Sequence, residues 1–513
     1  MKRLLITPNM EISYQEVCKV ASGKISLKLT PATFRAIEET YSFVTNRENR
    51  DKVYGIDTGV ADFSTVPIRE NQLSQMQVNM LRSHSAGLGH PLPKEVVRSI
   101  IFSRILTLAR GHSKIRPLTL QLLVDLLNYG ITPVVPELGA IGCGDLQPLA
   151  CIGLVLLGEG EVEYQGEHMK AQKAMKKAGI VPMKELTIEA LSLIDGNSAV
   201  IGLGSILAEE VKQLIQLFTI SSSLVIEGRQ GTIAPFDHHV SLARKFIGQS
   251  DISKTIAALL QGSSILESTS NSRGMLQDPV SIRSTPQVIG TALDSLRSLI
   301  DVLGIEINSA GDNPVIFAKE KMVVQAANFM SLQLGTQLDM VVKNISNITS
   351  YATSTMQIMT NPIYNEGLPK YLIQNPGINS GLMIPIYTAQ GINSEIIAST
   401  FPRSALMVGV ANGWEDISSG SWNSALNLRR IIRLSKHILA LHFLYGMQSI
   451  SLRKKIRLGR NTKKIYDYLN LHLNHSFPIT TDIRYDYLVS HIETIVSGAG
   501  FYDLILRTSP KLF

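Results

Sequence analysis

Four long stretches of the chain carry apolar residues at steps of three and four, which is the spacing of one face of an α-helix. They cover residues 200–218, 289–303, 334–348 and 428–445. A long helix with a single apolar stripe needs neighbouring helices to cover that stripe. The pattern therefore predicts a mainly α-helical protein with a core bundle of long, near-parallel helices.

The first 200 residues are more broken, with glycine and proline concentrated around residues 55–65, 87–93 and 130–148. Loops of this kind can carry function where a rigid body holds them. We therefore expect a loop-rich N-terminal lobe, residues 1–198, that carries the active-site loops. Residues 199–513 are expected to form the central and C-terminal helical bundle.

The composition is that of a protein with a sizeable core, since 44% of the 513 residues are hydrophobic and 18% are charged. The apolar run at the N-terminus is too short for a signal peptide, and no apolar segment of about 18 residues is uninterrupted. We therefore expect no membrane association. The net charge of +7 raises nucleic-acid binding as a possibility, but the basic residues are scattered. The densest basic cluster, residues 453–457, lies at the C-terminal end of a predicted helix, and we expect its side chains to be exposed to solvent.

The cysteines are too few and too irregularly spaced for a disulfide framework or a zinc site. They are Cys18, Cys143 and Cys151. We therefore expect no bound metal, no nucleic-acid partner and a reducing, cytoplasmic location.

Eight short motifs rich in glycine, asparagine and charged residues are spread along the chain. In order they read YGIDTG from residue 54, RSHSAG from 82, GAIGCGDLQPLA from 139, QDPVSIR from 277, DNP from 312, ANF from 327, NPGINSG from 375 and WED from 414. A glycine-rich loop alone is more often a plain turn than a site. The full set, in this order, resembles the motifs of the histidine and aromatic amino-acid ammonia-lyases over roughly residues 15–500.

The resemblance implies the ammonia-lyase fold, a small-molecule substrate and a homotetramer in which each active site draws on three subunits. It implies that Tyr54 takes part in acid–base chemistry, and that His84 and Glu415 face an imidazole ring. A histidine and a glutamate can together satisfy both ring nitrogens. Arg283 would bind the substrate carboxylate through its bidentate fork. The resemblance also carries substrate-binding roles to Gln277, Asn313 and Phe329.

Three pieces of the family's machinery differ in this chain. In the family an Ala-Ser-Gly tripeptide cyclises into an electrophilic methylidene-imidazolone group, whereas this loop is one residue shorter and has Gly142, Cys143 and Gly144 there. Two family asparagines are Asp57 and Asp195 here, and a proton-moving tyrosine is replaced by Val280. A missing residue in a strained loop disfavours cyclisation. We therefore expect no cofactor, with a cyclised Gly-Cys-Gly loop as the alternative.

Without the electrophile the leaving group must depart unaided, as trimethylamine can. Asp57, Asp195 and Trp414 would favour a quaternary cation, a pattern similar to that of ergothionase-type members of the family. Residues 383–386 offer no lysine that could assist a thione end of the substrate.

We therefore expect a carbon–nitrogen lyase that eliminates trimethylamine from a histidine-type substrate such as ergothioneine, giving a urocanate-type product. Its catalytic residues would be Tyr54, Glu415 and Asp195. Two alternatives stay open. One is a conventional histidine ammonia-lyase that releases ammonia through a modified Gly-Cys-Gly electrophile, and the other is a catalytically inactive homologue that acts as a scaffold.

Overall fold

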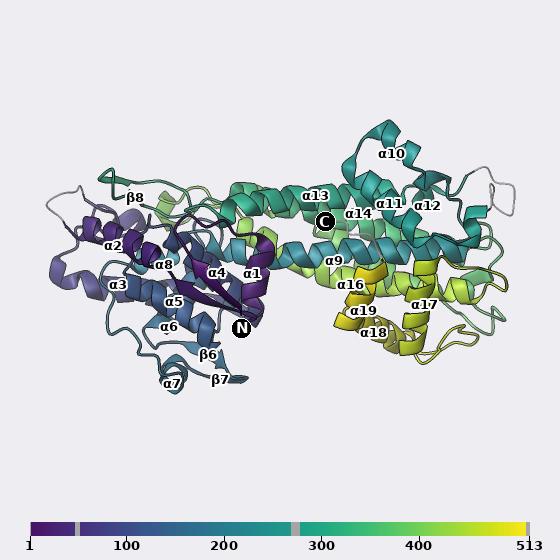
Figure 1. Ribbon diagram of the computed structural model, residues 1–513, viewed down its shortest axis with the longest axis horizontal. Helices are drawn as coiled ribbons and strands as arrows, with labels where there is room; N and C mark the ends of the chain where they lie inside the picture. Colours follow the sequence, from purple (N-terminus) through teal and green to yellow (C-terminus); the bar gives the residue numbers. More distant parts are fainter. Residues whose placement is uncertain (1, 47–51, 268–276, 509–513) are drawn as a thin grey trace. The chain divides into compact units, whose positions relative to one another are not determined.

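The computed structural model describes residues 2–46, 52–267 and 277–508. These residues form two compact units that interleave along the sequence (Figure 1). Unit 1 comprises Met1–Glu209, Ser298–Asp339 and Pro402–Leu428, and unit 2 comprises Glu210–Arg297, Met340–Phe401 and Arg429–Phe513. The predicted boundary between residues 198 and 199 lies one residue inside helix α9, which begins at Ser198, whereas the first change of unit lies between Glu209 and Glu210.

Unit 1 contains short helices and four small sheets. Its short helices are α1 (Tyr14–Ala21), α2 (Pro31–Thr45), α3 (Leu73–His84), α4 (Lys94–Ala109), α5 (Pro117–Tyr129), α6 (Leu146–Leu156), α7 (Ala171–Lys177) and α8 (Ala190–Ile194). The sheets pair β1 (Lys2–Ile6) in parallel with β2 (Ile25–Leu29), and β3 (Leu88–Pro91) with β5 (Pro136–Leu138). The other two are β4 (Thr132–Pro133), β6 (Glu161–Tyr164) and β7 (Glu167–Lys170) in that order, and β8 (Val315–Phe317) with β9 (Met322–Val324).

Helix α4 is the core element of the N-terminal part of unit 1. All its residues from Val96 to Ala109 are buried, because apolar side chains surround the helix on every side and α1 and α5 pack against it. The buried guanidinium group of Arg98 on α4 donates to the backbone carbonyl oxygens of Ala21 and Leu127. Arg104, two turns further along, reaches the functional site described below.

The four predicted apolar stripes lie on the four longest helices. These are α9 (Ser198–Arg229), α13 (Thr285–Ile307), α14 (Leu332–Thr360) and α16 (Ser421–Ser451). All but two of the predicted stripe residues are buried, so the mainly α-helical prediction is confirmed. Within the described residues, one helical run, Ala190–Arg229, contains an 18-residue window long and apolar enough to cross a membrane, with a mean hydropathy of 1.4. However, 94% of that window is buried inside the protein, as expected for a core helix.

Unit 2 adds shorter helices to its parts of the long ones. They are α10 (His238–Arg244), α11 (Ile247–Leu259), α12 (Val280–Arg283), α15 (Met383–Ala398), α17 (Arg460–His472), α18 (Tyr485–Val496) and α19 (Ala499–Thr508). The prediction of a solvated basic face at residues 453–457 is wrong for Arg453. Its guanidinium is part-buried and donates to the carbonyl oxygens of Gly228, Arg229 and Asn365. Gly228 and Arg229 end helix α9 and Asn365 lies in a turn, so these carbonyl groups need donors from outside their own segments.

Candidate active site

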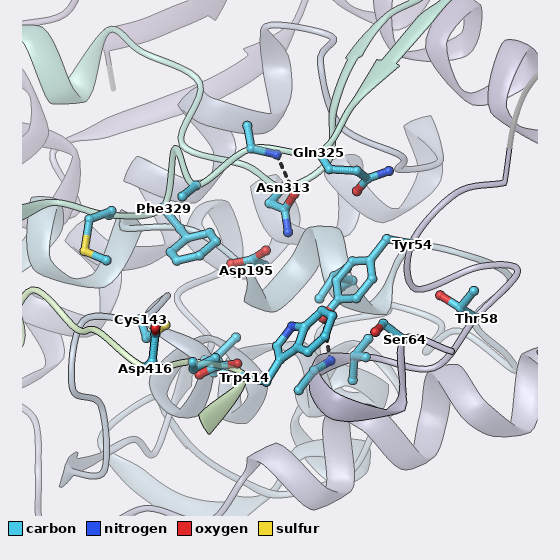
Figure 2. A pocket seen from close by; sticks show the side chains of 18 of the residues that line it. Tyr54, Thr58, Ser64, Cys143, Asp195, Asn313, Gln325, Phe329, Trp414 and Asp416 are labelled. Atoms are coloured by element: carbon cyan, nitrogen blue, oxygen red, sulfur yellow. Dashed lines mark hydrogen bonds between the residues drawn. The ribbon is translucent and has the colours of Figure 1, made fainter. Parts of the chain in front are cut away.

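A cavity of about 750 Å³ lies within unit 1, where several loops meet. Most of the predicted site residues line it, and Figure 2 shows several of them facing the same space. The predicted residues in the lining are Tyr54, His84, Cys143, Asp195, Asn313, Phe329, Trp414 and Glu415. The fold therefore brings together side chains that are spread over more than two thirds of the chain.

The phenol of Tyr54 is held by the turn that follows it. Its oxygen accepts a hydrogen bond from the backbone N–H of Ala61 at 2.6 Å (Figure 2). Burial raises the pKa of Tyr54, the Ala61 N–H opposes that shift, and the neighbouring carboxyl groups Asp195 and Glu415 add to it. The N–H can stabilise a phenolate, but negative neighbours disfavour one. A cation in the cavity would remove that disadvantage.

The prediction that Asp57 faces the cavity is not supported by its placement. Its carboxylate folds back and accepts a hydrogen bond from the backbone N–H of Val53 at 2.8 Å, four residues earlier. Asp57 is not among the residues that line the cavity. A short acidic side chain in a turn often bonds to the local backbone in this way.

The shortened glycine-rich loop is fixed by backbone hydrogen bonds. The carbonyl oxygen of Gly142 accepts from the backbone N–H and the hydroxyl of Ser419, at 3.2 and 2.9 Å. Gly142 and Gly144 have left-handed φ values of 82° and 73°. A Cβ atom at 142 would clash with the Ser419 hydroxyl, and one at 144 would lie 2.9 Å from Oδ1 of Asp195. The loop backbone therefore requires glycine on both sides of Cys143.

Cys143 occupies the place of the serine from which the family forms its electrophile. Its thiol is buried, and burial together with Glu415 and Asp195 raises its pKa to about 12, so it is protonated at neutral pH. Forming the electrophile requires the nitrogen of residue 144 to attack the carbonyl carbon of Gly142 with loss of that carbonyl oxygen as water, followed by loss of a side-chain hydroxyl at 143 as a second water. Here residue 143 carries a thiol in place of that hydroxyl, and the loop is one residue short. These residues do not fit the methylidene-imidazolone group.

Asp195 is the most deeply buried carboxyl group of the cavity, only 5% exposed. It follows α8, and its backbone carbonyl accepts from Arg104, which also bonds the carboxylate of Asp312. Burial raises the pKa of Asp195 well above its usual range. Asp312 and Glu415 raise it further, whereas Arg104 and Lys114 lower it. These surroundings therefore favour the neutral form of Asp195, and a positive charge in the cavity would favour the ionised form.

The side chain of His84 has a defined orientation at the end of α3. Its Nδ1 lies 2.8 Å from the carbonyl oxygen of Met80, which can only accept a hydrogen bond. The proton is therefore assigned to Nδ1, and Nε2 keeps a free lone pair as an acceptor. Asn313 also lines the cavity: its Oδ1 accepts from the N–H of Ala326 at 3.0 Å, which leaves the Asn313 amide N–H groups as donors (Figure 2).

The segment at residues 414–417 supplies both charge and aromatic surface. Trp414 is 56% exposed and lines the cavity together with Glu415 and Asp416. Phe329 and Tyr54 add two further aromatic walls, and Figure 2 shows these rings with Asp195 between them. Three carboxyl groups and three aromatic rings therefore surround one space.

The predicted site residues did not include several residues of the lining. Among them are Lys52, Ser64, Gln325, Met330 and Asp416. Asp416 adjoins Glu415 and could have been included on that ground. Lys52 and Gln325 lie outside the motifs, and only the folded loops bring them to the cavity.

Two predicted substrate-binding residues, Gln277 and Arg283, belong to unit 2 and do not line this cavity. Gln277 is exposed, and Arg283 ends the short helix α12 with a half-buried side chain. The segment between them is anchored by Asp278, whose carboxylate is paired with the buried Arg229 at 2.5 Å and accepts from the N–H of Thr232.

One group of possible metal ligands occurs within the described residues. Asp237, His238 and His239 place one ligand atom each within 4.8 Å of one another. All three are exposed and adjacent in sequence, and Asp237 caps helix α10 through the backbone N–H of His239. Capping accounts for the position of Asp237 without a metal.

Comparisons of the sequence agree with these motifs. Residues 12–470 match the family model for aromatic amino acid lyases. A histidine ammonia-lyase of Treponema denticola is 32% identical over 497 residues, covering 96% of this chain and 97% of that protein. A histidine ammonia-lyase of Geobacillus thermodenitrificans is 35% identical over 415 residues, covering 81% of this chain and 82% of its own.

Solved structures are similar over nearly the whole chain. The ergothioneine-degrading enzyme ergothionase from Treponema denticola, in complex with desmethyl-ergothioneine sulfonic acid, has a TM-score of 0.92 at 25% identity, covering 97% of this chain and 99% of that one. Tyrosine aminomutase from Streptomyces globisporus has a TM-score of 0.92 at 28% identity, covering 99% and 100% of the two chains. The predicted ammonia-lyase-like fold is confirmed.

Proposed function

The chain belongs to the aromatic amino acid lyase family, and we propose that, as a carbon–nitrogen lyase of this family, it eliminates trimethylamine from a histidine-type betaine such as ergothioneine. The product would be a urocanate-type acid with a new carbon–carbon double bond. The reaction would take place in the cytoplasm, in a homotetramer with shared active sites.

The main support for this proposal is that carboxyl groups and aromatic rings line the same cavity. Its carboxyl groups are Asp195, Glu415 and Asp416, and its aromatic walls are Tyr54, Phe329 and Trp414. Carboxylates and aromatic faces together attract a quaternary ammonium group, which keeps its charge at every pH. Burial, Asp312 and Glu415 raise the pKa of Asp195, and a cationic substrate would lower it again by favouring the carboxylate.

The misfit of the electrophile is the second support. An amino group leaves poorly unless it is first activated, which is the task of the electrophile in the family. A trimethylammonium group needs no activation, because it departs with the electron pair of the broken carbon–nitrogen bond as neutral trimethylamine. The base takes the β-proton, and the electrons of the carbon–hydrogen bond form the double bond.

The geometry suggests a role for each group. Tyr54 removes the β-proton once the substrate cation has offset the negative field of Asp195 and Glu415, and the Ala61 N–H stabilises the phenolate. His84 accepts a ring N–H through Nε2, and Glu415 receives the other ring N–H.

Further contacts fix the remaining parts of the substrate. Asp195 and Trp414 hold the quaternary nitrogen, whereas Asn313 and Phe329 contact the substrate body. Gln277 and Arg283, supplied by a neighbouring subunit, bind the carboxylate. Binding of the carboxylate by these two residues depends on the homotetramer, because neither of them lines the cavity in unit 1 of the same chain.

The similarity to the ergothionase of Treponema denticola favours this substrate class. A second function, histidine ammonia-lyase activity, is favoured by the names of relatives that are 32–35% identical. It would require the Gly142, Cys143 and Gly144 loop to cyclise.

The deciding experiment is a substrate screen with the purified protein. Ergothioneine, the trimethyl betaine of histidine and histidine itself are each followed by the ultraviolet absorbance of a conjugated acid, and the released amine is identified. We expect trimethylamine from a betaine, no loss of activity after borohydride, and activity within a few-fold of the parent for Cys143→Ala. Ammonia release from histidine that borohydride abolishes would overturn the proposal in favour of the second function.

A further inference from the structure

Two surface turns of unit 1 border the cavity from different ends of the sequence. The first contains the 3-10 helix η2 (Ala61–Phe63), and the second contains the 3-10 helix η8 (Ala411–Gly413). The side-chain amide of Asn412 donates to Oδ2 of Asp62 at 2.8 Å, across 350 residues of sequence. We call this hydrogen bond the latch.

The first turn holds the phenol of Tyr54. Ala61, which donates its N–H to the Tyr54 oxygen, has a left-handed φ of 52° and directly precedes Asp62. A residue other than glycine holds this conformation only when surrounding contacts offset its cost. A contact that holds Asp62 in place therefore also holds the backbone N–H of Ala61, which donates to Tyr54.

The second turn carries Trp414 and Glu415 into the cavity. Three successive residues, Ala411, Asn412 and Gly413, have left-handed φ values of 50°, 52° and 86°. The turn is closed by hydrogen bonds from the N–H of Val410 to Glu415 and from the N–H of Trp414 to Ala411. These local bonds close the turn on itself but do not fix it to the rest of the cavity wall.

We infer that Asp62 and Asn412 are positioning residues, and that the latch sets Trp414 and Tyr54 at the spacing that the substrate requires. The inference depends on the proposed function only for the identity of that substrate. Without the latch, the two turns keep their local hydrogen bonds but lose the side-chain bond that joins them. The indole would then become more mobile, and the Ala61 donor would be less well aligned with the phenol.

Reciprocal substitution tests the latch without deleting either side chain. Asn412→Asp keeps the shape and the tolerance for left-handed φ but places two carboxylates against each other. Asp62→Asn keeps an acceptor oxygen for Asn412 and is the matched control. The combination of Asp62→Asn with Asn412→Asp restores a hydrogen bond of reversed direction.

We expect Asn412→Asp to lower kcat/KM for the betaine about 3- to 30-fold, less than for a buried hydrogen bond to a charged partner, because water screens part of the interaction at this exposed site. Asp62→Asn is expected to stay within about threefold of the parent. The double variant is expected to recover most of the loss. A double variant as impaired as Asn412→Asp alone would overturn the inference.

The fluorescence of Trp414 gives a measurement that needs no substrate. The chain has two tryptophans, and Trp422 is fully buried, so subtracting the emission of a Trp414→Phe variant isolates Trp414. Acrylamide quenching of that emission should increase in Asn412→Asp and return to the parent value in the double variant. Unchanged quenching in Asn412→Asp would refute the latch even if the betaine were not turned over. Conversely, restored quenching without betaine turnover would leave the latch standing and refute only the proposed function.

Discussion

Replacing Asp195 by asparagine removes a charge from the cavity while keeping the shape of the side chain. The carboxyl group is 5% exposed, and its pKa is raised by burial, Asp312 and Glu415. In the free protein it is therefore protonated at low pH and ionises as the pH rises through its raised pKa. A bound trimethylammonium group favours the ionised form. We expect Asp195→Asn to weaken turnover of the betaine.

The size of the effect follows from two opposing quantities. A carboxylate and a cation about 5 Å apart attract each other by about 3 kcal/mol at an effective dielectric constant of about 20. Each pH unit below the raised pKa of Asp195 costs about 1.4 kcal/mol to ionise the acid, which offsets part of this attraction. The net loss should be about tenfold to a few hundredfold in kcat/KM.

The assay measures kcat/KM for the betaine across the pH range in which the protein stays folded. The parent should gain activity as the pH rises through the pKa of Asp195, whereas Asp195→Asn should lack that increase. Asp57→Asn is the matched control, because the carboxylate of Asp57 bonds to the N–H of Val53 and does not line the cavity. It should change kcat/KM by about twofold at most. Equal kinetics for the parent and Asp195→Asn would refute the electrostatic reasoning.

Three further expectations concern other parts of the molecule. Glu415→Gln should lower turnover by at least about tenfold, whether the substrate is the betaine or histidine, because either presents a ring nitrogen there. Unchanged turnover of the substrate that the parent accepts would contradict this role. Burial raises the pKa of Asp145 to about 7, so the folded state holds a proton that the unfolded state has lost above about pH 4. The free energy of unfolding should therefore fall as the pH rises from 4 to 8, and urea titrations of Asp145→Asn should show a weaker fall. Light scattering at micromolar concentration should give the mass of a homotetramer, and a monomer would leave Arg283 without the neighbouring cavity that we propose for it.

The local periodicity of the sequence was enough to place the long helices. The apolar steps of three and four are a property of neighbouring residues on one helix, so they can be recognised in the sequence without knowledge of the tertiary contacts. The same holds for the motif residues, because the order of Tyr54, His84, Asn313 and Glu415 along the chain is itself the signal. All four line one cavity in the structure.

Contacts that join distant segments depended on the tertiary structure. The sequence offered Asp57 and Asp195 as equivalent carboxyl groups, yet a backbone N–H four residues away captures Asp57, whereas α8 and Arg104 place Asp195 in the cavity. The bond between Asp62 and Asn412 joins turns 350 residues apart, and neither turn has a pattern that points to the other. Helix periodicity depends on residues that are close in sequence, so the sequence alone determines it. The hydrogen-bond partner of an exposed polar side chain is determined only when the packed helices bring two distant loops together.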